Sequence, residues 1–398
     1  MASVTSAAGT TTSLSAGGAP DAQDGAARAT DTLVALLRGD ALDPHVLAEC
    51  DADALWIAAA EHRVLPLVAE RMAHRAEVPE AIRLMFRATA TEDAVTDLIR
   101  ESELVRLVAD LAKAHVRPLL LKGSQLAYSH YPRADLRPRV DSDLLIPASD
   151  LSAVQEVLGR LGYEPKDGQL SGSLVIAQAL YSKRKGGRLL HAVDVHWKVA
   201  SPQVFAEMLS YSELAERAIP LPALGPGARG LSSVDALLVA CVHRIAHHLD
   251  SDRLIWLYDI KLIAEGLTTP DWKAFLDLTV DRKVTAVCMR SLQRTDALFP
   301  GTTPSWVWDA ARVATQADVE LSEGYLTERS QAQLMLDDLR ALPRWRDRAR
   351  LIGQHVFPPA SFMRRTYAPS SRAPLLVLYG LRFIRGATRW LGVSQGRA

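Results

Sequence analysis

The sequence is poor in cysteine, has no net charge and contains no long apolar run. Its three cysteines, Cys50, Cys241 and Cys288, lie far apart among 398 residues, and none belongs to a CxxC pair. This spacing argues against a disulfide framework or a zinc ribbon and favours a reducing, cytoplasmic location. No stretch approaches the roughly 18 apolar residues of a membrane-spanning helix, so we expect no span.

The balance of charge excludes further classes of protein and hides an asymmetry. The chain has 46 Lys and Arg against 46 Asp and Glu, a formal net charge of +0. This balance argues against a generally basic nucleic-acid binder and against an acidic disordered chain. Residues 340–398, however, hold 12 Arg, no Lys and one acid, Asp347, so this segment carries +11 and residues 1–339 carry −11.

The order of apolar residues predicts helices, then a small α/β core, then helices again. Hydrophobic residues make up 48% of the chain, which is typical of a protein with a packed core. The first 30 residues include 22 Ala, Ser, Thr or Gly, a composition typical of disorder. We therefore expect five parts: a disordered tail at 1–28, an N-terminal helical region at 29–115, a core at 116–222, a C-terminal helical domain at 228–340 and an Arg-rich helical segment at 341–398.

Within the core, short apolar runs predict strands. One strand is expected at 117–123 and a second at 140–146, with a helix at 125–129 that Ser124 could cap. Two more strands are expected at about 174–182 and 190–197, joined by a hairpin turn at 183–187.

Acidic residues interrupt two of these strands. Asp141 and Asp143 are two residues apart in one predicted strand, so both carboxylates should lie on one face of the sheet. Asp194 lies in the last strand, with His196 two residues further on. Neighbouring carboxylates are costly unless a cation lies between them, and oxygen ligands favour Mg²⁺ or Mn²⁺. The alternative is that these acids end strands or pair with nearby arginines.

A turn that could hold phosphate precedes these acids. Lys122, Gly123 and Ser124 follow a predicted strand and begin a helix, so backbone N–H groups and a hydroxyl would face an anion there. Lys122 adds a positive charge. A phosphate-binding turn followed by an Asp-x-Asp metal site is chemically consistent with binding of a metal–triphosphate complex.

These motifs together resemble a known superfamily. They are Leu121 to Ser124, Tyr131-Pro132, Arg137 to Ile146 and Val193 to Trp197. The chain resembles the DNA polymerase β-like nucleotidyltransferase superfamily, and looks most like a little-characterised bacterial group of nucleotidyltransferase family proteins. Weaker similarity to that group, around His62 and from His243 to Ile260, extends the resemblance to about 50–290. The 16 residues between Ser124 and Asp141 exceed the commoner superfamily spacing.

The resemblance implies an α+β fold whose 116–222 core is a small mixed β-sheet of the polymerase-β type. It also implies transfer of a nucleoside monophosphate from an NTP, such as ATP, to an unknown hydroxyl acceptor with release of pyrophosphate. By this resemblance Asp141 and Asp143 would bind two Mg²⁺ or Mn²⁺ ions, and Asp194 would bind the catalytic ion. Gly123, Ser124 and Arg137 would contact the triphosphate.

Two histidines have less specific roles. His196 is expected to orient Asp194, and His243 to pack against the core or contact nucleotide or acceptor. The pattern His243-Arg-Ile-Ala-His247 lacks the glutamate of a metalloprotease helix, because Arg244 takes its place.

An alternative function remains open. A catalytically silent relative could act as an RNA- or protein-binding module through its basic C-terminal segment, which could equally contact an acidic acceptor or a membrane surface. The same arginines could instead form a solvated helical face that neutralises the acidic body of the chain.

Overall fold

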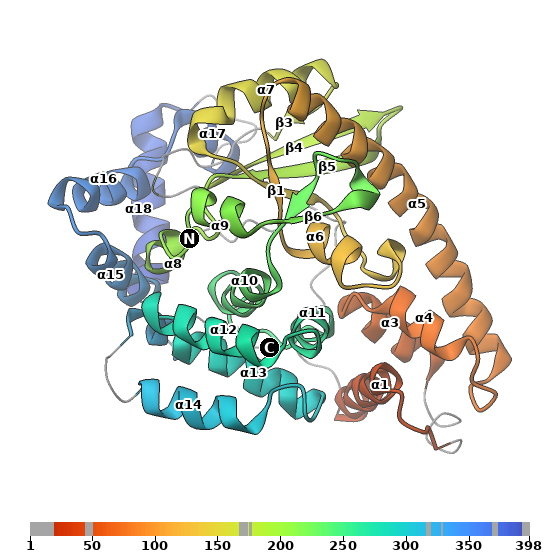
Figure 1. The fold of residues 1–398 in the computed structure, drawn as a ribbon. Helices are drawn as coiled ribbons and strands as arrows, with labels where there is room; N and C mark the ends of the chain where they lie inside the picture. The colour runs from red at the N-terminus through yellow and green to blue at the C-terminus, as the bar shows by residue number, and fades with distance from the viewer. Residues whose placement is uncertain are drawn as a thin grey trace.

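The computed structural model describes residues 20–43, 51–166, 174, 177–315, 320–327, 329–367 and 373–391. Within these residues, helices flank one mixed sheet of seven strands (Figure 1). This arrangement confirms the predicted α+β class, with a small sheet between N-terminal and C-terminal helical regions. Helix α1 begins at Pro20, inside the tail predicted to be disordered, whereas residues 1–19 of that tail lie outside the described residues.

The N-terminal region forms four described helices. They are α1 (Pro20–Arg38), α3 (Ala52–Glu61), α4 (Leu65–Met72) and α5 (Glu80–Lys113). Asp51 caps α3 by accepting a hydrogen bond from the backbone N–H of Asp53 at 3.0 Å. Helix α5 spans 34 residues along one side of the molecule and packs against α7 and β5 (Figure 1). It therefore connects the N-terminal helices to the sheet.

The sheet has the strand order β3-β4-β5-β2-β1-β7-β6. Its strands are β1 (Leu119–Leu120), β2 (Ser142–Leu145), β3 (Glu164–Pro165), β4 (Gln178–Lys185), β5 (Arg188–His196), β6 (Ile219–Pro220) and β7 (Arg229–Gly230). The β2–β5 and β1–β7 pairs are parallel, and the other pairs are antiparallel. All four residues of β2 are buried, as expected for a strand at the centre of a sheet that is covered on both faces.

The β4–β5 hairpin confirms two of the predicted strands. Its turn is shorter than expected, because only Gly186 and Gly187 lie between the strands. Both glycines have positive φ, at 58° and 79°, a conformation that a two-residue hairpin turn requires and that other residues adopt at a cost.

Helices also follow and cross the sheet. Those within or beside it are α6 (Lys122–Ser129), α7 (Leu151–Arg160), α8 (Gln203–Ala206) and α9 (Tyr211–Arg217), with short 3₁₀ helices η1 (Ala134–Leu136), η2 (Ala148–Asp150) and η3 (Pro222–Leu224). Those after it are α10 (Ser233–Ala246), α11 (Leu254–Glu265), α12 (Thr269–Asp281), α13 (Thr285–Leu298), α14 (Ser305–Thr315), η4 (Leu321–Tyr325), α15 (Gln331–Ala341), α16 (Trp345–Val356), α17 (Ala360–Tyr367) and α18 (Leu375–Leu391). Among the described residues, no helix is both long and apolar enough to cross a membrane.

Three hydrophobic clusters hold these elements together. The first joins side chains of α1, α3 and α4 to those of α10 to α13, so the two helical regions share one core. The second lies between the sheet and helices α5 and α7. The third, small and separate, is formed by Phe362, Met363 and Leu378 of α17 and α18.

The sheet extends to Gly230, beyond the boundary expected at residue 222. The Pro- and Gly-rich stretch at 220–227 lies within the β6–η3–β7 connection. Gln125, fully buried on α6, fixes the end of β7: its side-chain amide donates to the carbonyl of Leu231 at 2.7 Å and accepts from the N–H of Leu231 at 2.9 Å. This pair of bonds connects the helix beside the acidic strand to the start of the C-terminal helices.

Replacing Gln125 with leucine should test this connection. Gln125→Leu keeps a similar volume but leaves the buried N–H and C=O of Leu231 without partners, so we expect a loss of about 2–5 kcal/mol in the free energy of unfolding. Urea denaturation measures it. Gln155→Leu, which removes one hydrogen bond to the Tyr181 hydroxyl, is the control and should lose much less. Equal losses in the two variants would contradict the role assigned to Gln125.

Candidate functional site

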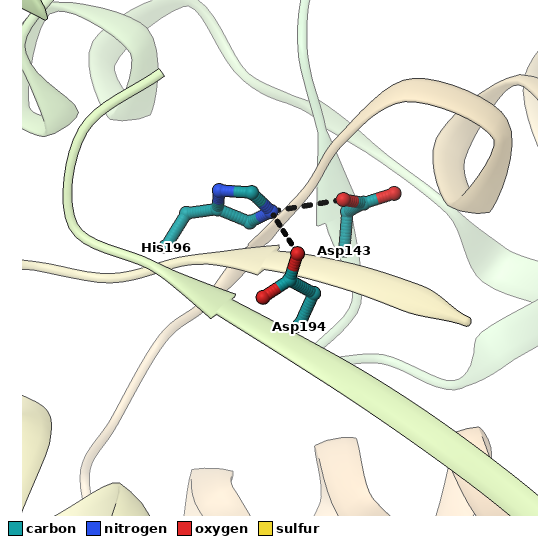
Figure 2. A group of neighbouring side chains, drawn as sticks. All are labelled: Asp143, Asp194 and His196. Carbon is teal, nitrogen blue, oxygen red and sulfur yellow. Dashed lines mark hydrogen bonds and ion pairs between the residues drawn. The ribbon is translucent and has the colours of Figure 1, made fainter. Parts of the chain in front are cut away.

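Two carboxylates lie side by side at the centre of the sheet. Strands β2 and β5 are parallel neighbours, and Asp143 pairs with Asp194 in their register. Paired residues on adjacent strands lie on the same face, and His196 follows on that face two residues after Asp194. All three side chains are buried. Figure 2 shows them converging, with one ring nitrogen of His196 pointing toward both carboxylates.

The geometry of this group suits a cation. His196 Nε2 lies 2.8 Å from Asp143 Oδ1 and 3.5 Å from Asp194 Oδ2 (Figure 2). One ligand atom from each residue falls within 4.8 Å of the others. The second carboxylate oxygen of Asp194, Oδ1, is buried without a hydrogen-bond partner among the described residues. An unpaired buried oxygen is costly, and a bound ion would satisfy it.

The structure places Asp141 near this group but not within it. Strand β2 begins at Ser142, so Asp141 precedes the strand instead of lying inside it as the sequence predicted. Burial, reinforced by the negative charges of Asp143 and Asp194, raises the pKa of Asp141 to about 7. Asp141 is therefore close enough to sense both carboxylates. Burial also raises the pKa of Asp194, and Asp143 adds to that shift.

Lys122 provides a positive charge to these acids. Its Nζ donates to Asp143 Oδ1 at 2.8 Å and lies 3.5 Å from His196 Nε2. Burial alone would lower the pKa of Lys122, but Asp143 and Asp194 outweigh it and raise that pKa. Burial likewise opposes ionisation of Asp143, yet Lys122 and His196 hold its pKa well below the usual value. Lys122, which the sequence predicted to bind phosphate, thus forms an ion pair with Asp143 on β2.

The turn before α6 differs from the predicted one. Helix α6 begins at Lys122, which has a φ of +52°, and Ser124 does not cap it. The Ser124 hydroxyl instead accepts from the N–H of Asp143 at 2.9 Å and lies 3.5 Å from the carbonyl oxygen of Asp141, to which it donates. The prediction that Ser124 caps this helix is wrong, because its hydroxyl bonds to the strand across the turn. The Ser124 hydroxyl thereby fixes the backbone of Asp141 and Asp143.

A comparison with protein families gives a match over residues 48–300, to a family described as "Uncharacterised nucleotidyltransferase". The chain belongs to this family. The match includes the whole sheet and helices α3 to α13, and it confirms the resemblance inferred from the motifs. A comparison with curated proteins found no match. Membership supports a general role in nucleotidyl transfer, and the Asp143–Asp194–His196 group is where the protein could hold a metal.

Arg137, predicted to contact phosphate, has another partner in the structure. Its guanidinium donates to both carboxylate oxygens of Asp259 on α11, with Nε to Oδ1 at 2.8 Å and Nη2 to Oδ2 at 2.7 Å. Both side chains are buried, and the Tyr131 hydroxyl donates to the same carboxylate at 2.7 Å. The guanidinium also packs on Gly123, where an added Cβ would lie about 3.0 Å from it. A phosphate contact by Arg137 stays a prediction, while its bond to Asp259 is a clear structural role.

Helix α10 brings a histidine cluster close to the acids. His243 Nε2 lies 3.1 Å from His248 Nε2, and His248 stacks on Trp256 with ring centroids 3.8 Å apart. Burial, with the charge of Lys122 next in importance, lowers the pKa of His243 well below its usual value and that of His247 to about 3. These imidazoles are therefore neutral near the site. His243 Nδ1 and His247 Nε2 have no hydrogen-bond partner among the described residues.

Sequence reasoning did not anticipate several of these neighbours. Asp259 pairs with Arg137, which lies 122 residues away, so no local spacing in the sequence indicates this pair. The i, i+4 spacing of His243 and His247 was visible in the sequence, but it did not fit a metalloprotease helix. Arg244 between them is fully buried and pairs with Asp250 and Asp252, which accounts for the basic residue at that position.

Removing the carboxylate of Asp259 should destabilise the protein strongly. Asp259→Ala leaves the Arg137 guanidinium buried without a counter-charge and the Tyr131 hydroxyl without an acceptor, so we expect a loss of about 3–5 kcal/mol in the free energy of unfolding. Urea denaturation measures it. Asp110→Ala, which removes an ion pair with Lys113 on the surface, is the matched control and should change stability by less than about 1 kcal/mol. A loss in Asp259→Ala as small as in the control would contradict the assignment.

The raised pKa of Asp141 predicts a pH dependence in metal-free buffer. Between its usual value of 3.8 and about 7, the folded protein holds a proton that the unfolded chain has released. Stability should therefore fall as pH rises through this range. Asp141→Asn removes the titration, so at pH 8 we expect this variant to be more stable than the native protein by about 1–3 kcal/mol, and at pH 4 nearly equal to it. Urea denaturation with a chelator checks this, and parallel pH profiles would contradict it.

Proposed function

We propose that this protein transfers a nucleoside monophosphate from an NTP to a hydroxyl acceptor, with release of pyrophosphate and with Mg²⁺ or Mn²⁺ as cofactor. The observation that carries the proposal is the pairing of Asp143 with Asp194 on parallel strands, where one buried carboxylate oxygen has no hydrogen-bond partner among the described residues. The family match supports nucleotidyl transfer in general. The motif resemblance extends this to the NTP donor and the hydroxyl acceptor.

The donor atoms fit the proposed metal. Asp143 and Asp194 offer carboxylate oxygens, which suit Mg²⁺ and Mn²⁺, and His196 offers an imidazole nitrogen or orients both acids. When bound, such a metal would neutralise phosphate charge and lower the pKa of an acceptor hydroxyl. Asp141, just before β2, is the further acid that the motif resemblance assigns to metal binding.

The chain's own residues suggest how substrates are handled. By the motif resemblance, Asp194 would help to remove the proton of the attacking hydroxyl while it holds the metal. Lys122, at the start of α6, places a positive charge within 2.8 Å of Asp143, where it could also attract the phosphates of the NTP. His243 and His247 are neutral, so they add no positive charge beside Lys122.

Nucleotidyl transfer can be measured directly. The protein is incubated with labelled NTPs, Mg²⁺ or Mn²⁺ and a cell extract as the source of acceptors, and pyrophosphate release and label transfer are followed. Asp143→Asn and Asp194→Asn should each lower the rate at least about 100-fold, because each removes a charged metal ligand while keeping the shape of the side chain. Addition of a chelator should abolish transfer.

Two controls make the result specific. Asp110→Asn, a substitution of an exposed carboxylate on α5, should leave transfer unchanged. Thermal unfolding with Mn²⁺ alone gives a readout independent of activity: the ion should raise the Tm of the native protein and of Asp110→Asn, but not that of Asp143→Asn. Full transfer by Asp143→Asn with Asp194→Asn combined would refute the site assignment.

One observation favours the alternative of a catalytically silent binding module. Lys122 and His196 already compensate the charge of Asp143, so these buried acids can be stable without a metal. In that case the protein would show neither transfer nor a shift of Tm with Mn²⁺. Binding of RNA or protein would then survive Asp143→Asn but be lost on removal of 340–398.

A further inference from the structure

The C-terminal helices form a small unit of their own at one edge of the molecule. Helices α16, α17 and α18 lie together on the side away from α1 and α3 (Figure 1). Phe362 and Met363 of α17 and Leu378 of α18 form a small separate core, and Arg382 of α18 donates to the carbonyl of His355 at 2.9 Å, which connects α16 to it. The Tyr379 hydroxyl donates to the carbonyl of Pro358 at 2.6 Å, which connects α18 to the segment between α16 and α17. This unit lies outside the residues matched by the nucleotidyltransferase family, 48–300.

Helix α18 has an apolar face that points away from this core. Leu376, Val377, Phe383 and Ile384 are exposed, at 86%, 51%, 77% and 71%. Their spacing of i, i+1, i+7 and i+8, with Gly380 at i+4, places them on one face of the helix. Buried Leu378 lies on a different face, so α18 has apolar side chains both toward its neighbours and toward solvent.

Helix α16 repeats this pattern with arginines beside the apolar stripe. Trp345, Ile352 and Val356 are exposed at i, i+7 and i+11, and they lie on one face. Arg346 and Arg350 lie on one flank of this face, and the guanidinium of Arg346 is 5.8 Å from the Trp345 ring. Buried Leu351 faces the protein instead. The exposed surface of α16 is therefore both apolar and basic.

Several arginines of this unit have no acidic partner among the described residues. None of its arginines at 344, 346, 348, 350, 364 and 382 forms an ion pair with a described acidic residue. Arg348 donates to the carbonyl of Leu342, and Arg382 to that of His355. Among the described residues, Arg340 pairs with Asp337, and the other acids in ion pairs have basic partners earlier in the chain, as in Asp97 with Arg139. The expectation that the basic segment neutralises the acidic body is thus not met by these side chains.

We propose that α16, α17 and α18 form a docking surface for a membrane that carries anionic lipids, with the helices lying in its headgroup layer. Exposed Trp, Phe, Leu and Ile side chains beside arginines are the features by which amphipathic helices bind such surfaces. The aliphatic side chains would leave water, and the arginines would contact lipid phosphates.

Other occupants fit less well. A second copy of the chain would bring two surfaces with the same positive charge together, which is unfavourable. RNA would satisfy the arginines and could stack on Trp345, but it would gain little from exposed Leu376, Val377 and Ile384. A lipid surface is the partner that matches the apolar and the basic side chains at once.

Sedimentation with vesicles tests the proposal on the full chain. The protein should sediment with vesicles of phosphatidylcholine and phosphatidylglycerol at low salt and much less with phosphatidylcholine alone. Arg346→Gln with Arg350→Gln should weaken binding by about tenfold or more, since each arginine near such a surface contributes about fivefold. Phe383→Ser with Ile384→Ser should weaken it by a similar factor while keeping the charge.

Matched variants serve as controls. Leu98→Ser, on an exposed apolar side chain of α5, and Arg188→Gln, on an exposed arginine of β5, should bind as the native protein does. The native protein's tryptophan emission should shift to shorter wavelength on binding, and Trp345→Phe should reduce that shift. All substituted side chains in the test variants are exposed, so the unfolding midpoints should stay unchanged.

Three results would overturn the proposal. One is the absence of sedimentation with anionic vesicles at low salt. Another is native-like binding by both double variants. The third is that these double variants abolish tight binding of single-stranded RNA, or a dimer seen by sedimentation velocity, while vesicle binding stays weak. That result would assign the surface to RNA or to self-association.

Discussion

The arrangement of the whole centre depends on compensating the charge of two aspartates that the sheet holds side by side. Asp143 and Asp194 are fixed by the register of β2 and β5, so their carboxylates cannot move apart. In a buried environment two negative charges at this separation are unfavourable. The molecule answers with Lys122 and His196, both in contact with Asp143, while one oxygen of Asp194 stays without a partner among the described residues. The charge of Asp143 is thus compensated, and that of Asp194 only in part. A divalent ion bound between the two carboxylates could compensate the rest.

Contacts of helix α6 with other elements hold Lys122 and Asp143 in position. The Ser124 hydroxyl bonds to the N–H of Asp143, Gln125 on the same helix fixes Leu231, and Arg137 packs on Gly123 while it pairs with Asp259. The first two contacts are hydrogen bonds from α6 to β2 and to the residue after β7. The third is packing of Arg137 on α6, and Arg137 in turn pairs with α11. The turn at Lys122 is therefore supported on three sides. Such support is needed to keep a lysine at positive φ close to a carboxylate.

Part of this could be predicted from the sequence, because strand periodicity is a local property. The two-residue spacing of Asp194 and His196 placed them on one face, and acids within apolar strands indicated a site. The motifs identified the family. The positions of Lys122, Ser124 and Arg137 could not be predicted in the same way. Each of these side chains can bind either a ligand or another residue of the protein. Which of the two it binds depends on residues that are distant in the sequence and that folding brings near. For Arg137 that partner is 122 residues away.

The distribution of ion pairs gives the neutral composition a physical meaning. Buried acids of the body are compensated by arginines of the body, as in Asp97 with Arg139, Asp259 with Arg137, and Asp250 with Arg244. Pairs of this kind are fixed by burial, because separating them would leave an isolated charge in a poorly solvated place. The described arginines after residue 341 are mostly exposed, and an exposed guanidinium gains little from a distant acid in water. These described arginines therefore add little to the ion pairs that stabilise the body, and the neutrality of the whole chain is the sum of two charge distributions that are largely independent of each other.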